Sequence, residues 1–462
     1  MLQERGRTHW LRGFALKCWE TGPVRWPKGL GSPPNLTAVS VLCWGLCLCF
    51  VILPSCVLLS NHFKAGEGYD FVYFYGAGRL ASTRPITNLY DYAAQLKTFN
   101  EISPSRYGYY GPSPYPPFIG LFFSLFARLP FKIAFLLWLV TSLALYIVGI
   151  GAASKLAFPR ERPKRSLLLC FALAYPPFLL FTLANGQVAA VAVFSLALAV
   201  YLEGRSLPFW SGFALCLLTY KLTLLLLILP MLILTRRFKA LGGFVIGGLS
   251  LVVMSTVLAG IQVWSAYAHM LITFRGLSQG QAPGIHHALK RWQFVDLNSL
   301  SYAVMGGRSM PGRVILTCII IGAATWLAVL WWRSAGRSTP IQQLAWATTL
   351  VWTLLLNVYA PIYDSTLMTI VVILILGALT DLNWQHATRW TVILALIMYA
   401  VSWVTASIAQ AHGIQLLTLV LLVFGVIGNL FLQRALAVAV AEEQEFSQFA
   451  APTLFQQHNA NG

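Results

Sequence analysis

A long apolar stretch occupies residues 131–153 and reads FKIAFLLWLVTSLALYIVGIGAA. At about 1.5 Å of rise per residue, a helix of this length crosses the roughly 30 Å hydrocarbon core of a bilayer. Pro130 stands directly before the stretch, and Lys155 follows it at the start of a basic loop. We therefore predict one transmembrane helix here, and similar apolar stretches recur along the chain.

The composition of the whole chain is typical of a membrane protein. Of the 462 residues, 58% are hydrophobic and 10% are charged, whereas soluble domains carry about 25% charged residues. Soluble multidomain architectures are therefore excluded. The stretch 37–60 is too long for a signal-peptide core and has no small-residue cleavage pattern, so we interpret it as a retained membrane helix.

The formal net charge of +18 comes from Lys and Arg that gather in short loops. This pattern is typical of cytoplasmic loops of membrane proteins, so nucleic-acid binding is not predicted. Four of the eight cysteines lie within 37–60, and the sequence has no metal-type Cys or His spacing and no phosphate-cradling glycine loop. We expect no metal and no cofactor.

The positive charges also predict which helix ends share a side of the membrane. Basic loops lie at 155–165, 236–239 and 333–337, and the residues before 37 are basic as well. Because cytoplasmic loops carry an excess of Lys and Arg, we place all of them in the cytoplasm.

The apolar segment 116–129 is too short to cross the membrane comfortably. A second crossing just before 131–153 would also move the basic loop at 155–165 to the outer side. We therefore interpret residues 116–127 as a helix at the outer interface.

Another interrupted pair of segments lies at 208–219 and 222–235, with Lys221 between them. Short, broken helices are tolerated in membrane proteins where they line a cavity or pack on protein, so we predict a short hairpin with Lys221 at its tip. About ten crossings are expected besides this hairpin. Beyond 37–60 and 131–153, they lie at 166–184, 187–203, 240–260, 311–332, 341–357, 365–380, 390–409 and 414–433.

This topology divides the chain into three parts. Residues 1–36 form a basic cytoplasmic tail, residues 37–433 a transmembrane domain, and residues 434–462 a cytoplasmic tail that contains three glutamates. The outer loops of the domain cover about 61–130 and 261–310.

Asp70 is the leading candidate for chemistry among the acidic residues. Six of the fourteen acids are predicted on the outer side, and Asp70 lies just after the first membrane helix in a loop rich in Tyr and Phe. An ionisable group so close to hydrocarbon is a functional candidate. It could act as a general base, or it could cap a helix that begins at Phe71. The other outer acids are Glu67, Asp91, Glu101, Asp296 and Asp364.

Polar residues at the predicted tips likewise have a structural and a functional interpretation. Asn185 and Gln187 either cap a turn or bind a headgroup or sugar hydroxyl, and Lys221 either snorkels to the interface or pairs with a lipid phosphate. His286 and Arg291 belong to a basic, aromatic patch that could meet a phosphate or anionic lipid.

Several short motifs occur in a fixed order along the chain. They are Asp70, Gly78-Arg79, Leu89-Tyr90-Asp91, Tyr115-Pro116-Pro117, Trp138, Asn185-Gly186-Gln187, Tyr220-Lys221, Asn298-Ser299-Leu300 and Tyr363-Asp364. Together they resemble glycosyltransferase family 87, the polyprenyl-phosphate-mannose-type transferases of the GT-C membrane class, over residues from about 60 to 380.

The resemblance implies an all-α GT-C-type transmembrane bundle with outer loops and interfacial helices. It also implies a metal-independent, inverting transfer of a hexose, such as mannose or a related sugar, from a polyprenyl-phosphate donor to a glycolipid or glycan acceptor at the outer face of the plasma (inner) membrane. Asp70 would be the base. Donor contacts would come from Lys221, Gln187, Asn185, His286 and Arg291, and further substrate contacts from Tyr115, Arg79, Asn298, Tyr363 and Asp364.

The chain departs from the family pattern at two places. Lys221-Leu222-Thr223 stands where many members have Lys-Pro-Gln, and Pro361-Ile362-Tyr363-Asp364 stands where mannan-type members have Trp-x-His-His. The second difference leaves the donor sugar open. Two other functions also stay open: a transporter or flippase of lipid-linked saccharides, and an O-antigen ligase or polymerase that uses a polyprenyl-diphosphate donor.

Overall fold

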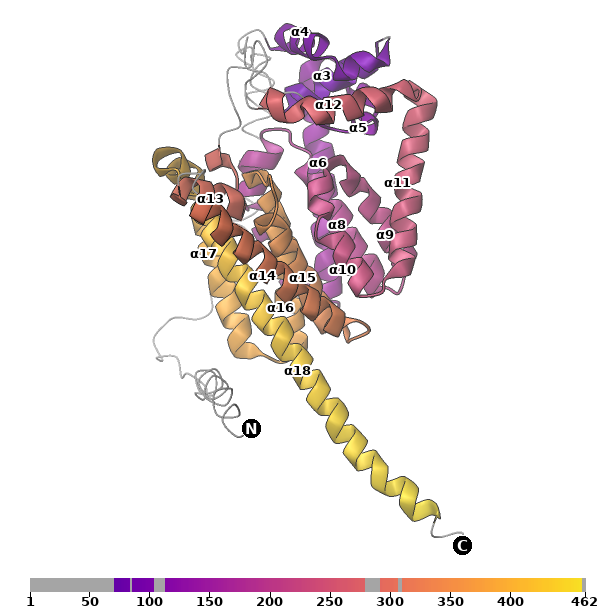
Figure 1. Cartoon of the computed structure of the whole chain (residues 1–462), viewed down its shortest axis with the longest axis vertical. Helices are drawn as coiled ribbons and strands as arrows, with labels where there is room; N and C mark the ends of the chain where they lie inside the picture. The colour runs from indigo at the N-terminus through magenta and orange to yellow at the C-terminus, as the bar shows by residue number, and fades with distance from the viewer. Residues whose placement is uncertain (1–69, 84, 104–112, 279–290, 306–309, 459–462) are drawn as a thin grey trace. The chain divides into compact units, whose positions relative to one another are not determined.

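The computed structural model describes residues 70–83, 85–103, 113–278, 291–305 and 310–458 (Figure 1). The predicted helix at 37–60, Glu67 and His286 lie outside these residues, as does the side chain of Arg291. The described chain folds into helices and has no strand apart from an isolated β-bridge between Phe294 and Pro361. The protein is an all-α polytopic membrane protein, as the sequence predicts.

Seven helices within the described ranges are long and apolar enough to cross a membrane. They are α6 (Phe131–Ala157), α9 with η6 (Pro208–Leu225), α11 (Phe238–Ala259), α14 (Met310–Ser334), η8 with α16 (Ile362–Asp381), α17 (Gln385–His412) and the part of α18 up to Gln444 (Leu416–Gln444).

Three further predicted crossings correspond to shorter or bent elements. The segment 166–184 is α7 (Arg162–Leu173) and η5 (Pro177–Leu183), which meet at an angle of 50°. The remaining two are α8 (Ala189–Gly204) and α15 (Thr339–Leu355).

The remaining elements are short, and most of them belong to the predicted outer loops. They are α3 (Phe71–Ala81), η2 (Ile86–Tyr90), α4 (Tyr92–Ile102), α5 (Pro117–Ser124), η4 (Phe126–Arg128), α10 (Ile228–Leu234), α12 (Gln262–Ser278), η7 (Arg291–Gln293) and α13 (Leu297–Met305). The last helix, α18, ends at His458 (Leu416–His458).

The sequence of α6 shows how a membrane helix acquires two faces. Trp138, Tyr146 and Ile150 are fully buried, whereas Ile133 and Val140 are more than half exposed. Residues three to four apart share one face of a helix, so α6 turns one face to the bundle and the opposite face outward. Pro130 stands at the N-cap of α6, where its missing N–H costs nothing.

The helix α16 lies at the centre of the bundle. In the most apolar 18-residue stretch of η8 and α16, 94% of the residues are buried. The corresponding share is 17% for α11 and 22% for α14. A helix that is apolar all round is a buried helix. The neighbouring element η8 therefore carries Asp364 into the protein interior.

The predicted break in the hairpin occurs at Lys221. Its backbone (φ −140°, ψ 82°) leaves the helical region inside η6, and α10 follows after Leu227. The structure differs from the prediction in that no loop separates α9 from η6: together they cover 18 residues up to Leu225, enough for a membrane span, with the kink at Lys221 near its end. Gly212 explains the close packing of this stretch on α11, because a Cβ there would lie 1.7 Å from the Ala240 carbonyl oxygen.

Buried polar contacts join three helix ends on one side of the bundle. The Arg237 guanidinium lies 2.8 Å from a Glu203 carboxylate oxygen and also donates to Gln342. Trp346 donates its Nε1–H to Glu203 at 2.9 Å. The end of α8 and the starts of α11 and α15 therefore share a side, as the charge pattern predicts.

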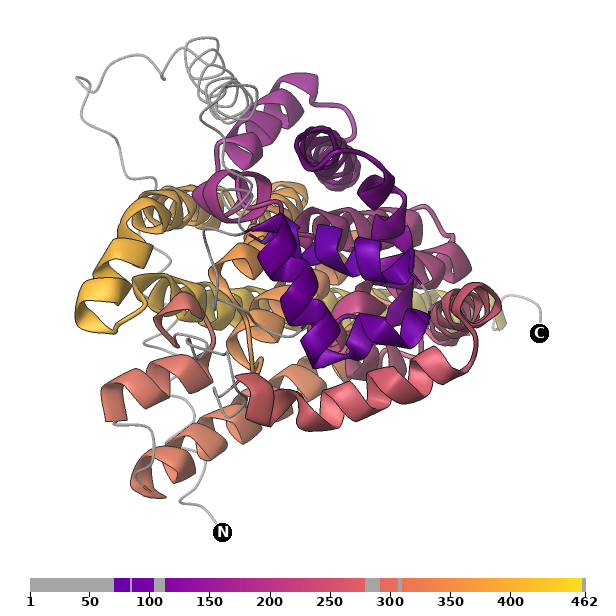
Figure 2. The same cartoon turned by 90° about the horizontal axis from the view of Figure 1, so that it is seen from above.

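Short helices gather at the other end of α6 and α11. Figure 1 shows α3, α4, α5 and α12 there, and Figure 2 shows α12 running beside the indigo segment that contains η2. A small apolar cluster that includes Leu80, Leu89, Tyr90, Val263 and Met270 holds α3, η2 and α12 together. These helices form the surroundings of Asp70.

Candidate active site

The turn at Asn185, Gly186 and Gln187 packs directly on the start of α3. Gly186 has a φ of +68°, and a Cβ there would lie 2.6 Å from the Cβ of Phe71. The Phe71 N–H donates to the Asn185 carbonyl oxygen at 3.1 Å, and the Trp138 Nε1–H donates to the Gly186 carbonyl oxygen at 2.9 Å. Glycine is required because it alone accepts both this backbone conformation and this close approach.

Gln187 reaches the carboxylate of Asp70 from this turn. Its Nε2 donates to Asp70 Oδ2 at 2.7 Å, and only 5% of the Gln187 residue is exposed. Asp70 occupies the N-cap position of α3, yet its side chain makes no capping hydrogen bond to the helix. The alternative that Asp70 serves as a helix cap therefore lacks the contact that defines a cap.

Lys221 and Asp364 form a second polar pair. The Lys221 ammonium makes an ion pair with Asp364 Oδ2, and the two side chains are 11% and 1% exposed. Lys221 Nζ also lies 5.3 Å from the ring centre of Tyr359 and 5.0 Å from that of Tyr363. The cation is therefore neutralised by one carboxylate and flanked by two aromatic rings, whose faces attract positive charge.

Tyr115 connects the two pairs. Burial raises the pKa of its hydroxyl, and the neighbouring Tyr359 hydroxyl and the carboxylates of Asp70 and Asp364 raise it further. Burial likewise raises the pKa of Tyr359, with additional contributions from Asp364 and Asp70. Both carboxylates thus lie close enough to the same two hydroxyls for their charges to act on them.

Asp296 holds the loop that leads into η8. This fully buried carboxylate accepts hydrogen bonds from the Ser299 N–H at 2.8 Å and the Ala360 N–H at 3.2 Å. Burial raises its pKa, while the bonds from Ser299 and Ala360 act in the opposite direction. Asp296 therefore caps α13 and fixes the backbone just before Pro361.

The predicted site residues fall into two groups. The structure brings Asp70, Gln187, Tyr115, Lys221, Tyr363 and Asp364 together, with the Asn185 backbone against Phe71. Asn298 is partly buried in the first turn of α13, two residues after Asp296.

Arg79 lies elsewhere. It is exposed in the last turn of α3 and pairs with Glu101 at 3.7 Å. Nine residues of helix at about 1.5 Å per residue separate it from Asp70, so Arg79 is outside the cluster.

Sequence reasoning overlooked Tyr359 and the structural task of Asp296. Tyr359 belongs to the tip between α15 and η8, and its ring packs at a 45° tilt against that of Phe294, with centroids 4.7 Å apart. Its position in the same predicted tip as Tyr363 and Asp364 could have identified it as a candidate site residue. Asp296, by contrast, bonds a backbone N–H 64 positions away, and the sequence offers no sign of that contact.

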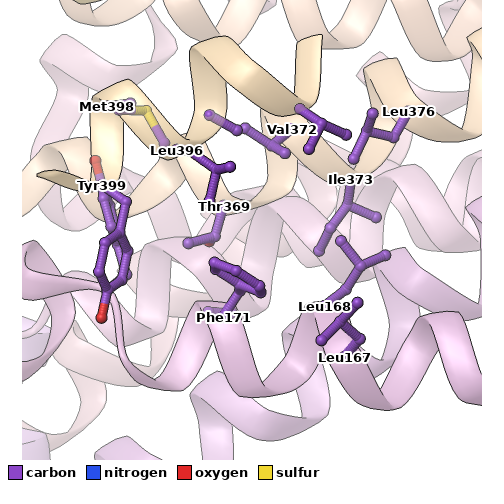
Figure 3. Close-up of a pocket in the computed structure, with 14 residues that line it drawn as sticks. Leu167, Leu168, Phe171, Thr369, Val372, Ile373, Leu376, Leu396, Met398 and Tyr399 are labelled. Carbon is purple, nitrogen blue, oxygen red and sulfur yellow. The ribbon is translucent and has the colours of Figure 1, made fainter. Parts of the chain in front are cut away.

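One cavity of the described chain lies apart from this cluster. A cavity of about 170 Å³ is lined by apolar side chains of α7, α16 and α17, among them Phe171, Ile373 and Leu396 (Figure 3). It contains none of the predicted site residues. Because apolar cavities of this size exclude water, we assign the chemistry to the polar cluster instead.

Among the residues that the structure describes, no group of three His, Cys, Asp or Glu side chains could hold a metal ion.

The fold defines a helical membrane protein with a buried group of acids, one lysine and several tyrosines at one end of its bundle. Comparison with family models places the chain in a family: it belongs to glycosyltransferase family 87, whose model matches residues 114–360. The matched part includes Tyr115, Gln187 and Lys221, whereas Asp70 and Asp364 lie outside it. No curated protein and no solved structure matches the chain. The protein is therefore a membrane glycosyltransferase.

Proposed function

We propose that the protein transfers a hexose, mannose or a related sugar, from a polyprenyl-phosphate donor to a glycolipid or glycan acceptor. The observation that carries this proposal is the proximity of the Asp70–Gln187 pair to the Lys221–Asp364 pair around Tyr115. The first pair offers a carboxylate to a hydroxyl, and the second offers a cation to a phosphate.

Asp70 acts as the general base in this proposal. It takes the proton of the acceptor hydroxyl while the hydroxyl oxygen attacks the anomeric carbon of the donor sugar. The bond between that carbon and the phosphate oxygen breaks, and the polyprenyl phosphate leaves with the electron pair. Attack from the face opposite the leaving group inverts the configuration of the anomeric carbon.

Lys221 stabilises the leaving phosphate. Negative charge grows on the phosphate oxygen as the bond breaks, and a preplaced cation in a buried site lowers the energy of that state. Asp364 and the rings of Tyr359 and Tyr363 hold the ammonium in position before the donor binds.

Asp364 is the competing acid, and its ion pair argues against a role as base. Lys221 already binds its carboxylate, and the Asp364 side chain is only 1% exposed, so an acceptor hydroxyl has little access to it. Asp70 is partly exposed and accepts a hydrogen bond from the neutral amide of Gln187. We therefore assign the base to Asp70 and the phosphate contact to Lys221.

The side of the membrane follows from the distribution of charge. Arg237 lies at the opposite end of α11 from the short helices around Asp70, and basic loops are retained in the cytoplasm. We infer that the reaction takes place at the outer face of the plasma (inner) membrane, with both termini in the cytoplasm. A polyprenyl-phosphate sugar can present its headgroup there from within the bilayer.

The donor class is tested with purified protein in liposomes that contain a radiolabelled polyprenyl-phosphate hexose and an extract of membrane glycolipids. We expect label to move into a second lipid or glycan product. An unlabelled polyprenyl monophosphate sugar should compete, and a diphosphate sugar should not. Competition by the diphosphate alone would instead identify a ligase or polymerase, and transbilayer movement of intact donor without product would identify a flippase.

A further inference from the structure

The turn at residues 185–187 contacts Asp70 through the side-chain amide of Gln187. We propose that Gln187 is a positioning residue that fixes the Asp70 carboxylate against the acceptor hydroxyl, and that it is not a contact to the donor phosphate. The inference rests on the proposed function, because it assumes that Asp70 is the base.

The orientation of the Gln187 amide supports this role. Its Nε2 donates to Asp70 Oδ2 at 2.7 Å, while its Oε1 lies 3.4 Å from the Val188 backbone nitrogen. Each end of the amide thus faces a group of the opposite hydrogen-bonding type. Turning the amide over would place an oxygen against the carboxylate and an NH₂ group against a backbone N–H, so the observed orientation is the stable one.

The turn that carries Gln187 is itself rigidly attached to the chain around Asp70. Phe71, the neighbour of Asp70, donates its N–H to Asn185, and Trp138 of α6 donates to Gly186. The space at Gly186 is filled by Phe71 and Phe135. The backbone of the base and the backbone of its amide partner are therefore one packed unit, in which Gln187 sets the direction of the carboxylate.

The direction of the carboxylate matters because general-base catalysis needs close alignment with the hydroxyl proton. A misplacement of about 1 Å is able to lower a rate about a hundredfold. The cation required by a phosphate is already supplied by Lys221, which forms its ion pair with Asp364. A buried neutral amide that donates to a carboxylate is suited to orienting that carboxylate.

The test is Gln187→Met, which keeps the length of the side chain and removes the donor. We expect kcat to fall about tenfold to a hundredfold, with KM for the polyprenyl-phosphate donor within twofold of that of the unmodified protein. A matched control is Gln95→Met, because Gln95 is equally buried at 6% and donates to the Leu89 carbonyl oxygen. This control should lower the melting temperature and leave kcat unchanged.

Two results would overturn the inference. A rise of tenfold or more in KM for the donor with kcat retained would make Gln187 a donor contact, and unchanged kcat and KM would give it no part in the reaction. If Gln187→Met does not fold, Gln187→Leu also removes the amide donor without adding a charge, and the same loss of kcat is expected. Transfer by the unmodified protein is measured in parallel: its absence would reject the proposed function itself, whereas transfer that does not respond to Gln187 rejects only the present inference.

Discussion

Lys221 and Asp364 are 143 positions apart in the sequence, yet they form a buried ion pair between a break in η6 and the first turn of η8. The backbone at Lys221 is not helical, and the Asp364 carboxylate is buried because η8 lies in the protein interior. Neither charge would be stable there alone, because an unpaired buried charge is costly. The pair therefore explains how both residues are accommodated.

The first prediction separates the structural and the chemical roles of this pair. Lys221→Met leaves the Asp364 carboxylate buried without its cation, so we expect about 3–5 kcal/mol of lost stability together with lost transfer. The double variant Lys221→Met/Asp364→Asn removes both charges and should regain most of that stability while transfer stays absent. Thermal unfolding in detergent and the transfer assay give the two readouts. Recovery of transfer in the double variant would show that Lys221 has no role beyond neutralising Asp364.

The second prediction concerns Gly186. An alanine at this position would combine a φ of +68° with a Cβ only 2.6 Å from Phe71. Strain of this kind costs on the order of 1–3 kcal/mol, and any relief must move Phe71 and hence Asp70. Gly186→Ala should therefore lower both the melting temperature and kcat. Gly151→Ala is the control, since no atom lies within 4 Å of the added Cβ on α6 and alanine is the better helix former.

The third prediction concerns the pH dependence that Asp296 introduces. Burial raises its folded-state pKa above the ordinary aspartate value of 3.8, so the folded protein holds this proton more tightly than the unfolded chain. The contribution of Asp296 to the free energy of unfolding is therefore greatest below pH 3.8. It is lost as the pH rises from 3.8 through the raised pKa of the folded state. Asp296→Asn should flatten the corresponding slope of melting temperature against pH. Equal slopes in the two proteins would contradict a raised pKa.

The fourth prediction concerns the sides of the membrane. Thr83 is exposed just after α3, and Ser338 is exposed just before α15, beyond the basic segment 333–337. In a cysteine-free background, Thr83→Cys should react with a membrane-impermeant thiol reagent in intact cells, because the proposed orientation places it outside. Ser338→Cys should react only after permeabilisation. The reverse pattern would place the polar cluster on the cytoplasmic side.

The helical elements could be predicted from the sequence because hydrocarbon thickness and the location of charge leave few arrangements. The stretch at 131–153 became α6, and the interruption at Lys221 was visible as a charge between two short apolar segments. The end of α9 was harder to predict, because η6 continues the helix in a tighter form that composition does not reveal. The close packing of Gly212 on α11 is a tertiary feature and outweighs local propensity there.

The candidate site could be predicted residue by residue but without its pairings. Asp70, Gln187, Lys221 and Asp364 each stood out as a polar residue in apolar surroundings. Which acid would meet Lys221 depended on the fold, since the partners come from η6 and η8 and are far apart in the sequence. Arg79 lies apart from the cluster although it is close to Asp70 in sequence, because helix α3 carries it to the opposite end of the element.

The most direct measurement of the central claim is sugar transfer by Asp70→Asn, which keeps the size of the side chain and removes the base. Asp91→Asn is the matched control, because Asp91 caps α4 by accepting from the Ala94 N–H at 2.7 Å and asparagine caps a helix equally well. We predict that folded Asp70→Asn loses at least about a hundredfold in kcat, while Asp91→Asn transfers sugar at the rate of the unmodified protein. Transfer at an undiminished rate by folded Asp70→Asn would contradict the assignment of Asp70 as the base.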